Sequence, residues 1–333
     1  MRILIVRLSA LGDAVLTLPL YFSLREYFPD AYIGWAAESG AAKLLQAVPG
    51  LNRVHVWRPE DKSLRGAWKF SREIKAEKYD IAIDAQGLSK SAILPFLAGI
   101  RRRIGFRRAP LEARELAPLL DNTLVSPPET LTHIAERSRY LAEPLGVFAK
   151  NEPSRLTLNP GEDARQYIAE WQKENGISRR IFLFGIGTSW ETKIWPAEYV
   201  AHLVREVGQR GYQAVVTWGP DEESKLPQWR EILGAQALWA PRTRNVSELI
   251  ALVESADRYA GPDSAPLHLA WLLGKPTFSW FGPSSAPRGA PTGKSHRHIV
   301  AFPPTRQRHG EPMWGLKPET VLPEFTAWLD DGK

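Results

Sequence analysis

One acidic side chain, Asp13, stands where general-base chemistry is possible. It follows the apolar run Ile3 to Val6, which is typical of a strand buried on both faces, and a polar stretch that contains Ser9 and Gly12. A helix with an apolar stripe begins here. Because ligands bind at the carboxyl ends of strands in an open parallel sheet, we expect Asp13 at the floor of a cleft, with its ionised form favoured by the helix N-terminus. The alternative is a plain helix cap.

A lysine, Lys193, lies between a second apolar run at residues 181–185 and a helix that begins near residue 197. The residues between them include Gly187, Thr188 and Ser189. Backbone amides and hydroxyl groups at such a place donate hydrogen bonds to phosphate oxygens, and the lysine supplies the compensating charge. The alternative is a solvated lysine in a surface loop.

An acidic residue also follows the next predicted strand, at residues 213–218. In doubly wound domains, an acid at the end of the second strand usually accepts hydrogen bonds from ribose hydroxyls. Glu222 is the first choice for this role, and Glu223 is the second.

The segment from Gly261 to Ala270 is the other strong candidate site. Asp263 is expected to cap the following helix, and Ser264 is expected to form an anion nest with the free amides of Ala265, Leu267 and His268. His268 lies about one turn along the helix, so its ring either faces the ligand or packs in the core.

Polar residues also follow the predicted strand at residues 79–84. Gln86 and Gly87 form the loop after it, where glycine permits a close backbone approach, and Lys90 lies at the start of the next helix. Residues 63–78 predict a basic amphipathic helix, which is either a membrane-surface helix or an ordinary crossover helix. The cationic run at residues 101–108 lacks the aromatic platform that single-stranded nucleic acid requires.

Basic charge is concentrated in the first half of the chain. The net charge is +6, and residues 53–114 alone contain 15 basic and 7 acidic residues. Such a face attracts anions, unless it is simply a solvated surface. The chain contains no cysteine, which excludes disulfides and thiol chemistry, and no Asp-x-Asp metal motif. We see no signal peptide and no apolar run of the roughly 18 residues that a transmembrane helix needs, so a cytosolic protein is expected.

Strands and helices alternate along the chain, and the alternation restarts after a Pro- and Asn-rich stretch at residues 147–161. A chain of 333 residues exceeds the usual size of one core. We therefore expect an α/β protein with two doubly wound domains that face each other across a cleft. Pro19, about two turns into the first helix, predicts a kink or a break there.

Taken together, these motifs resemble those of the bacterial heptosyltransferases of glycosyltransferase family 9, which build the inner core of lipopolysaccharide. The similarity comprises Leu-Gly-Asp at 11–13, Asp-Ala-Gln-Gly-Leu-x-Lys-Ser-Ala at 84–92, Lys-x-Trp-Pro at 193–196, and Gly-Pro-Asp-Ser with His268. Residues 84–92 most resemble the members that add the first heptose to Kdo on lipid A. The chain departs from the family at Ser189-Trp190-Glu191-Thr192, where Thr-Arg-Asp-Asp is common, and at Ala265, where glycine is common.

The resemblance implies a GT-B fold with an N-terminal acceptor domain (1–155), a C-terminal nucleotide-sugar domain (156–316) and a last helix (317–333) that returns to the first domain. It implies inverting transfer from ADP-heptose to Kdo–lipid A at the cytoplasmic face of the inner membrane, with peripheral membrane contact and with no metal, cofactor or nucleic acid. Asp13 would be the base and Lys193 the diphosphate ligand. Donor-binding residues would be Ser9, Gly12, Gly187, Thr188, Ser189, Lys193, Glu222, Asp263, Ser264, Ala265 and His268; acceptor-binding residues would be Lys62, Arg65, Gln86, Gly87, Lys90 and Arg107.

Two other functions remain compatible with the residues, because one fold hosts many activities. A nucleotide-sugar epimerase or hydrolase would need further carboxylates or histidines near Lys193, and Glu191 is the close candidate. A non-catalytic protein that binds membrane or nucleic acid would depend on the charges of residues 53–114 and not on Asp13.

Overall fold

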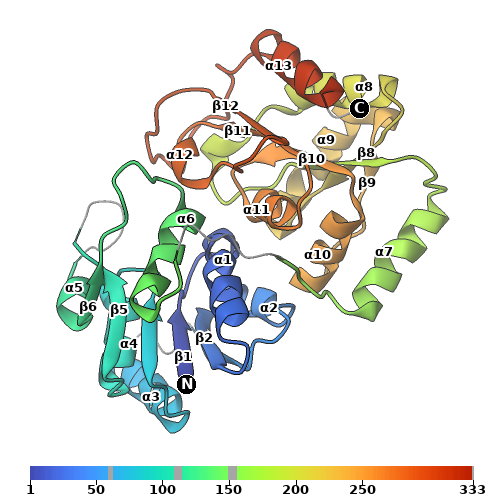
Figure 1. Cartoon of the computed structure of the whole chain (residues 1–333). Coiled ribbons are helices and arrows are strands. Elements are labelled where there is room, and N and C mark those ends of the chain that lie inside the picture. Colours follow the sequence, from blue (N-terminus) through green and yellow to red (C-terminus); the bar gives the residue numbers. More distant parts are fainter. Residues whose placement is uncertain (59–62, 109–114, 149–155, 332–333) are drawn as a thin grey trace. The chain divides into compact units, whose positions relative to one another are not determined.

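The computed structural model describes residues 1–58, 63–108, 115–148 and 156–331. The chain divides into two compact units, Met1–Asn159 and Pro160–Lys333 (Figure 1). The expected domain boundary at residue 155 falls outside the described residues. Each unit alternates strands and helices around its own parallel sheet, so the predicted pair of doubly wound α/β folds, the elements of a GT-B protein, is confirmed.

The first unit contains a six-stranded parallel sheet with the order β3-β2-β1-β4-β5-β6. The direction of winding changes between β1 and β4, and such a switch point is where ligands bind in doubly wound sheets. Val6 pairs with both Ala36 and Asp84, so three central strands reach this point together. The strands are β1 (Arg2–Val6), β2 (Tyr32–Glu38), β3 (Arg53–Trp57), β4 (Ile81–Asp84), β5 (Arg102–Phe106) and β6 (Thr123–Val125).

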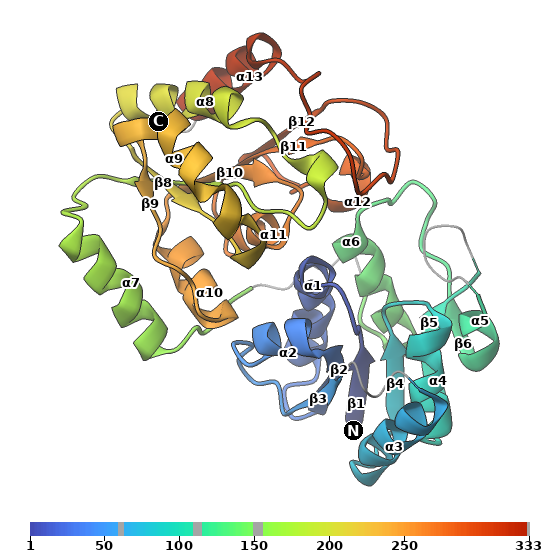
Figure 2. The ribbon, with the colours of Figure 1, turned by 180° about the vertical axis from the view of Figure 1, so that it is seen from behind.

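Helices cover this sheet with apolar faces. Phe70 and Ile74 pack with Leu94 against Leu4 and Val6, which places α3 and α4 on the same face of the sheet. Helix α1 lies beside α6 (Figures 1 and 2). The helices are α1 (Leu11–Tyr27), α2 (Ser39–Leu45), α3 (Leu64–Ala76), α4 (Ser89–Leu97), α5 (Ala117–Leu120), α6 (Ile134–Arg139) and the 3-10 helix η2 (Tyr140–Leu145).

Of the kink or break predicted at Pro19, the break is wrong, because helix α1 continues through Pro19. Proline removes one backbone hydrogen bond of a helix. Every residue from Ala14 to Leu24 is buried, however, so packing holds both halves of the helix in place.

The second unit repeats the same topology, with the strand order β12-β11-β10-β7-β8-β9. Its winding reverses between β7 and β10, which pair directly. The strands are β7 (Ile181–Gly185), β8 (Gln213–Thr217), β9 (Leu238–Trp239), β10 (Arg258–Pro262), β11 (Thr277–Phe281) and β12 (His296–Val300). The helices are α7 (Glu162–Glu174), η3 (Glu191–Lys193), α8 (Ala197–Gln209), η4 (Pro220–Lys225), α9 (Leu226–Leu233), η5 (Gly234–Gln236), α10 (Val246–Ser255), α11 (Ala265–Leu272), α12 (Ala286–Gly289) and α13 (Pro318–Asp330).

The last helix, α13, belongs to the core of the second unit. The Phe325 ring packs edge-on against Phe182 and Phe278, and Trp328 joins the same cluster. Arg210, the residue after α8, pairs with Asp330 of α13 at 3.0 Å, and the two helices lie side by side (Figure 2). The structure therefore corrects the expectation that residues 317–333 return to the first domain, because the apolar face of this helix is buried in its own unit.

Candidate functional site

In the first unit, polar residues gather at the carboxyl ends of β1 and β4. These strands are neighbours in the sheet, so the loops that follow them meet. Arg7, Ser9 and Asp13 follow β1, and Gln86 and Lys90 follow β4. The strand order therefore brings these two segments together.

Asp13 lies in the first turn of α1 with its side chain 38% exposed. The N-cap is Ala10, and Oδ2 of Asp13 accepts a hydrogen bond from the Ala10 amide at 3.5 Å, so Asp13 caps the helix from its first turn. One oxygen of Asp13 is 2.6 Å from Nη2 of Arg7, and Nη1 of Arg7 donates to the carbonyl of Ala85 at 2.8 Å. Arg7 therefore fixes an accessible carboxylate beside the β4 loop, as a general base requires. The sequence analysis did not assign this role to Arg7.

A buried carboxylate, Asp84, shapes the loop after β4. It accepts hydrogen bonds from the amides of Gln86 and Gly87, at 3.0 and 3.1 Å, and from the hydroxyl of Ser91 at 3.0 Å. Gln86 Oε1 in turn accepts from the amide of Leu8 at 2.7 Å. The loop after β4 is thus held against the segment that follows β1. These hydrogen bonds within the protein fix the position of the Gln86 side chain.

Lys90 completes this group, because its ammonium donates to Ser9 Oγ at 3.2 Å and pairs with Glu38 at 3.0 Å. Ser9, expected among the donor ligands, therefore lies with the residues expected to bind the acceptor. Gly12 lies in the first turn of α1. Arg107 bonds Ser126 instead, Arg65 lies on the exposed face of α3, and Lys62 falls outside the described residues.

Beneath this loop lies a second buried acid, Asp121. Burial, and then the nearby Asp84 carboxylate, raise the pKa of Asp121 to about 8, although Arg103 opposes the shift. Burial also raises the pKa of Asp84 to about 6, against the hydrogen bonds that it accepts. Gly105 makes room for Asp121, because a Cβ there would lie 2.0 Å from Oδ2 of Asp121.

The raised pKa values of Asp84 and Asp121 predict that the contribution of these two groups to stability falls with rising pH. Between about pH 4 and pH 8 the two carboxyl groups bind more protons in the folded protein than in the unfolded chain, so their contribution to the free energy of unfolding decreases across that range. In the Asp121→Asn variant we expect a smaller loss between about pH 6 and pH 8.5, measured as the urea midpoint. Asp30→Asn, which removes an exposed carboxylate, should behave like the original protein. An equal pH dependence in Asp121→Asn would contradict this account.

In the second unit, Lys193 is buried within an ion-paired cluster and is not a solvated surface lysine. Its ammonium lies 2.6 Å from Oδ2 of Asp263 and donates to the Asp263 carbonyl at 3.3 Å. The Trp190 ring covers it, with the ring centre 4.4 Å from Nζ. The loops that follow β7 and β10 are therefore joined at the winding switch point through one charged contact.

Asp263 bridges two cationic or protonatable groups. Oδ1 lies 3.1 Å from Nε2 of His268, while Oδ2 holds Lys193. Burial alone would raise the pKa of Asp263, but His268 and Lys193 hold it well below its usual range. The expected helix cap is wrong: the N-cap is Ser264, and no side chain caps α11. His268 is buried, as the core alternative predicted, yet it contacts the site through Asp263.

Of the backbone amides expected to form an anion nest at the start of α11, some are used inside the helix. The amide of His268 donates to the carbonyl of Ser264 at 3.3 Å inside the helix, so it is not a free donor. Ala265 and Leu267 lie in the first turn, where helix amides lack internal partners. Thr188 and Ser189 lie in the loop between β7 and η3, ahead of Lys193.

Glu222 is a buried carboxylate in η4, after β8. Its Oε2 accepts from the amide of Gly219 at 2.9 Å, and burial raises its pKa. The backbone of Gly187 lies against it, because a Cβ there would lie 2.5 Å from Oε2 of Glu222. Glu223 instead points to Arg242 at 3.1 Å and is half exposed. Of the two acids predicted to bind ribose, Glu222 is therefore the one that lies against the loop of Gly187.

A segment that the sequence analysis did not assign, residues 305–310, packs beside the Lys193 loop. Thr192 Oγ1 donates to the carbonyl of Gln307 at 2.5 Å, and the Arg308 guanidinium lies 5.2 Å from the Trp190 ring centre. Glu191 is half exposed and faces His309 at 3.6 Å. More than a hundred residues separate these partners, so no local pattern indicates the contact.

Metal-binding groups and membrane-spanning helices are both absent from the described part of the chain. Within those residues, no group of three or more His, Asp or Glu side chains is arranged to hold a metal ion. None of the helices described there is both long enough and apolar enough to cross a membrane.

Comparison with known proteins relates this chain to one family of enzymes. A family model for glycosyltransferase family 9 (heptosyltransferase) matches residues 67–312. Lipopolysaccharide heptosyltransferase 1 of Pseudomonas aeruginosa is 30% identical over 309 residues, which are 90% of this chain and 83% of that protein. A family 9 glycosyltransferase of Veillonella parvula superposes with a TM-score of 0.81 at 21% identity, over 99% and 97% of the two chains. An Escherichia coli heptosyltransferase solved with ADP gives a TM-score of 0.73 at 25% identity, over 99% and 98%.

Proposed function

Since this chain belongs to glycosyltransferase family 9, the heptosyltransferase family, we propose that it transfers a heptose from ADP-heptose to the Kdo of lipid A during lipopolysaccharide inner-core synthesis. The family membership confirms the resemblance seen in the sequence motifs and the class of enzyme, a glycosyltransferase. The donor, the acceptor and the stereochemistry are the proposal.

The observation that carries the proposal is the buried contact between Lys193 and Asp263. Two of the three ammonium hydrogens of Lys193 are directed at Asp263, and the third remains for a phosphate oxygen. Because Asp263 holds the side chain of Lys193 in place, the ammonium needs no rearrangement when negative charge develops on a departing diphosphate. Glu222 and the Gly187 backbone would then hold the ribose of the nucleotide.

Asp13 supplies the other half of the reaction. It would take the proton from the Kdo hydroxyl as that oxygen attacks the anomeric carbon of the heptose. The bond from this carbon to the diphosphate breaks in the same displacement, which inverts the configuration, and ADP leaves with its charge next to Lys193. Gln86, Gly87 and Lys90 lie beside Ser9 and are proposed to orient the anionic acceptor.

The competing activities find less support in the geometry. An epimerase or hydrolase needs a further acid or base close to Lys193, and Glu191 instead faces His309 and the amide of Gly310. A purely binding protein would not need a buried lysine held by a carboxylate at a strand end. We therefore propose transfer, by an enzyme located in the cytoplasm and at the inner-membrane surface that carries its lipid acceptor.

The direct test incubates the protein with ADP-heptose and Kdo–lipid A and identifies the product by mass spectrometry. We expect one heptose to be added to the acceptor and ADP to be released in equal amount. UDP-glucose in place of ADP-heptose is the control donor. Release of ADP at full rate without acceptor would instead indicate a hydrolase, and no heptosylated product would overturn the proposal.

The Gly187→Ala variant tests the nucleotide site. The added methyl group would meet the Glu222 carboxylate at 2.5 Å and displace it. We expect the KM for ADP-heptose to rise about tenfold, the scale of one hydrogen bond to a charged group, with a smaller change in kcat. Gly208→Ala, in α8 with open space around its Cβ position, is the matched control. An unchanged KM in Gly187→Ala would remove Glu222 from the donor site.

A further inference from the structure

Helix α3 carries an apolar face that nothing covers in the described part of the chain. Ala67, Phe70 and Ile74 are buried against the sheet, whereas the side chain of Leu64 is 90% exposed and that of Trp68 is 54% exposed. Residues four apart lie on the same side of a helix, so Leu64 and Trp68 form one exposed ridge. Large apolar side chains gathered in this way mark an interaction surface.

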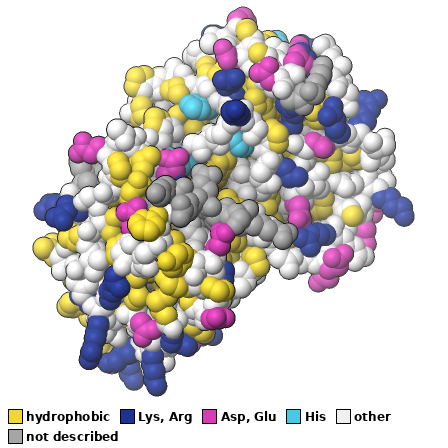
Figure 3. Space-filling model, viewed as in Figure 1, with side chains coloured by type: hydrophobic (Ala, Val, Ile, Leu, Met, Phe, Trp, Pro, Cys, Tyr) yellow, Lys and Arg dark blue, Asp and Glu magenta, His cyan; other side chains and the backbone are white. Residues whose placement is uncertain are grey.

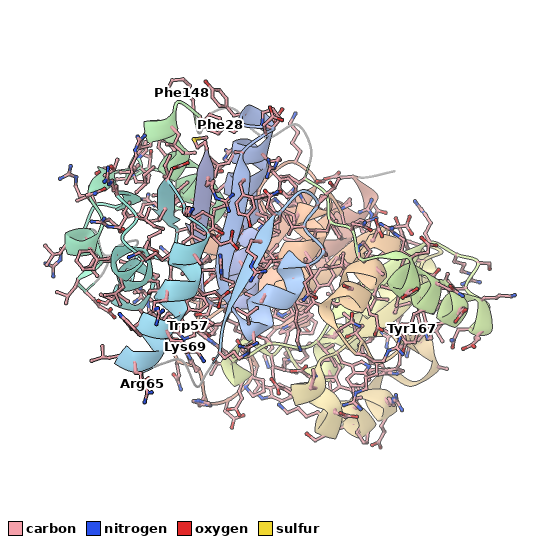
Figure 4. All side chains as sticks on the ribbon, turned by 90° about the horizontal axis from the view of Figure 1, so that it is seen from below. Phe28, Trp57, Arg65, Lys69, Phe148 and Tyr167 are labelled. Carbon is pink, nitrogen blue, oxygen red and sulfur yellow. The ribbon has the colours of Figure 1, made fainter. Side chains whose placement is uncertain are left out.

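The same side of α3 is strongly basic. Lys69, Arg72 and Lys75 are exposed along it, and the Arg72 guanidinium lies 4.9 Å from the Trp68 ring centre. The single acid of the helix, Glu73, is engaged by His55 at 3.0 Å and by Arg53 at 3.7 Å. Figure 4 shows Arg65 and Lys69 on the outer side of α3, and Figure 3 shows basic side chains gathered at the lower edge of this unit.

The short helix α5 and the residue before it add two further exposed apolar side chains, Leu119 at 79% and Leu116 at 59%. The amide of Leu116 donates to Ser89 Oγ at 3.1 Å, which fixes this segment to the start of α4. Helices α3 and α4 both cross over between parallel strands, so both begin at the carboxyl end of the sheet. The exposed leucines and Trp68 therefore border the end of the unit where Gln86 and Lys90 lie.

We propose that the outer side of α3, with Leu116 and Leu119, docks onto a bilayer that contains anionic lipids. Basic side chains around a few inserted apolar residues are the composition that binds such a surface, because the long aliphatic stems reach the acyl boundary while the charges meet the headgroups. A second copy of the chain is a poor occupant, because two such faces repel each other. Nucleic acid is also a poor occupant, because three of the four apolar residues are leucines, which do not stack on bases.

This inference rests on the proposed function, since it assigns the contact with the membrane that carries the acceptor. Vesicle binding tests it without donor or acceptor. Sedimentation with phosphatidylcholine vesicles, with and without phosphatidylglycerol, is compared for the original protein and for Leu64→Ser/Trp68→Ser and Lys69→Glu/Lys75→Glu. We expect binding to the anionic vesicles alone and a loss of at least about tenfold in the partition coefficient of each double variant.

Two matched controls test whether an exposed aromatic side chain or exposed basic charge elsewhere on the protein also contributes to vesicle binding. Phe148→Ser removes an aromatic side chain as exposed as Trp68, at 55%, and Lys173→Glu/Arg205→Glu reverses two exposed charges of the second unit. Both should bind within about twofold of the original protein. Equal losses in the controls, equal binding to neutral vesicles, or no vesicle binding would each overturn the proposal.

Turnover distinguishes a docking defect from a failed active site or a misfolded variant. Both α3 double variants should retain full activity on Kdo–lipid A dispersed in detergent and lose most of it on the same acceptor embedded in anionic vesicles. An active enzyme without vesicle binding would overturn the docking surface alone, whereas vesicle binding without transfer would overturn the proposed function alone. Loss of activity on the dispersed acceptor would also count against docking as the role of this face.

Discussion

The Asp13→Asn variant should lose at least about 100-fold in kcat, the usual contribution of a general base. Asparagine keeps the size of the side chain and an oxygen acceptor, but it does not accept the proton of the attacking hydroxyl. The Arg7 contact at 2.6 Å holds the carboxylate in one place, so the loss arises from chemistry and not from a displaced helix. The KM for the donor should change little, because the amide occupies the same volume.

The measurement is heptosyl product formation at saturating donor, with mass-spectrometric detection. Asp30→Asn, an exposed carboxylate in the same unit, is the control and should retain the original rate. Urea unfolding of both variants checks that the first unit is intact. A full rate in Asp13→Asn would remove this residue from the mechanism and leave the hydroxyl without a base.

The Lys193→Ala variant should lose at least about 100-fold in kcat/KM for ADP-heptose. Removal of one preorganised group that stabilises charge in a transition state usually has an effect of this size. The variant should also unfold more easily, because Asp263 is left as a buried carboxylate with His268 as its remaining partner. Breaking a buried pair costs about 3–5 kcal/mol in general.

A double variant separates these two consequences. Lys193→Met/Asp263→Asn removes both charges, so most of the stability should return while activity stays low. Calorimetric titration with ADP measures the affinity that is lost with the phosphate contact of Lys193. The control is Lys294→Ala, which removes an exposed lysine of the same unit. Recovery of activity in the double variant would show that Lys193 serves the fold and not the reaction.

Local patterns were sufficient for most of the elements and for the type of fold. Apolar runs of four or five residues, each followed by polar loops and an amphipathic segment, are found as β1, β4, β7 and β10 and as their crossover helices. Because parallel strands carry their loops at one end of a sheet, the same patterns placed Gln86, Lys90, Lys193 and Asp263 at strand ends, and the observed strand order then made them neighbours of their partners.

The errors lie where long-range contacts override local preference. Asp263 has the composition of a helix cap, but a lysine seventy residues earlier in the chain and a histidine one turn later bind its oxygens. Pro19 favours a broken helix, but the buried residues from Ala14 to Leu24 keep α1 continuous through it. The last helix has an apolar face that local sequence assigns to no partner, and Phe182 and Phe278 take it.

The sequence by itself determined that this protein has two doubly wound units and which loops carry acids, lysines and glycines, because strand and helix periods depend on neighbouring residues. Only the tertiary structure decided that Arg7 holds Asp13, that Asp263 holds Lys193, that Arg308 lies beside Trp190 and that the outer side of α3 stays uncovered. Arg7 and Asp13 are close in the chain, but Arg7 is fixed in turn by the carbonyl of Ala85 in the β4 loop. The other contacts join segments far apart in the chain, and the uncovered side of α3 depends on what the folded core leaves exposed. Their partners are chosen by the packing of whole elements, which no single stretch of sequence encodes.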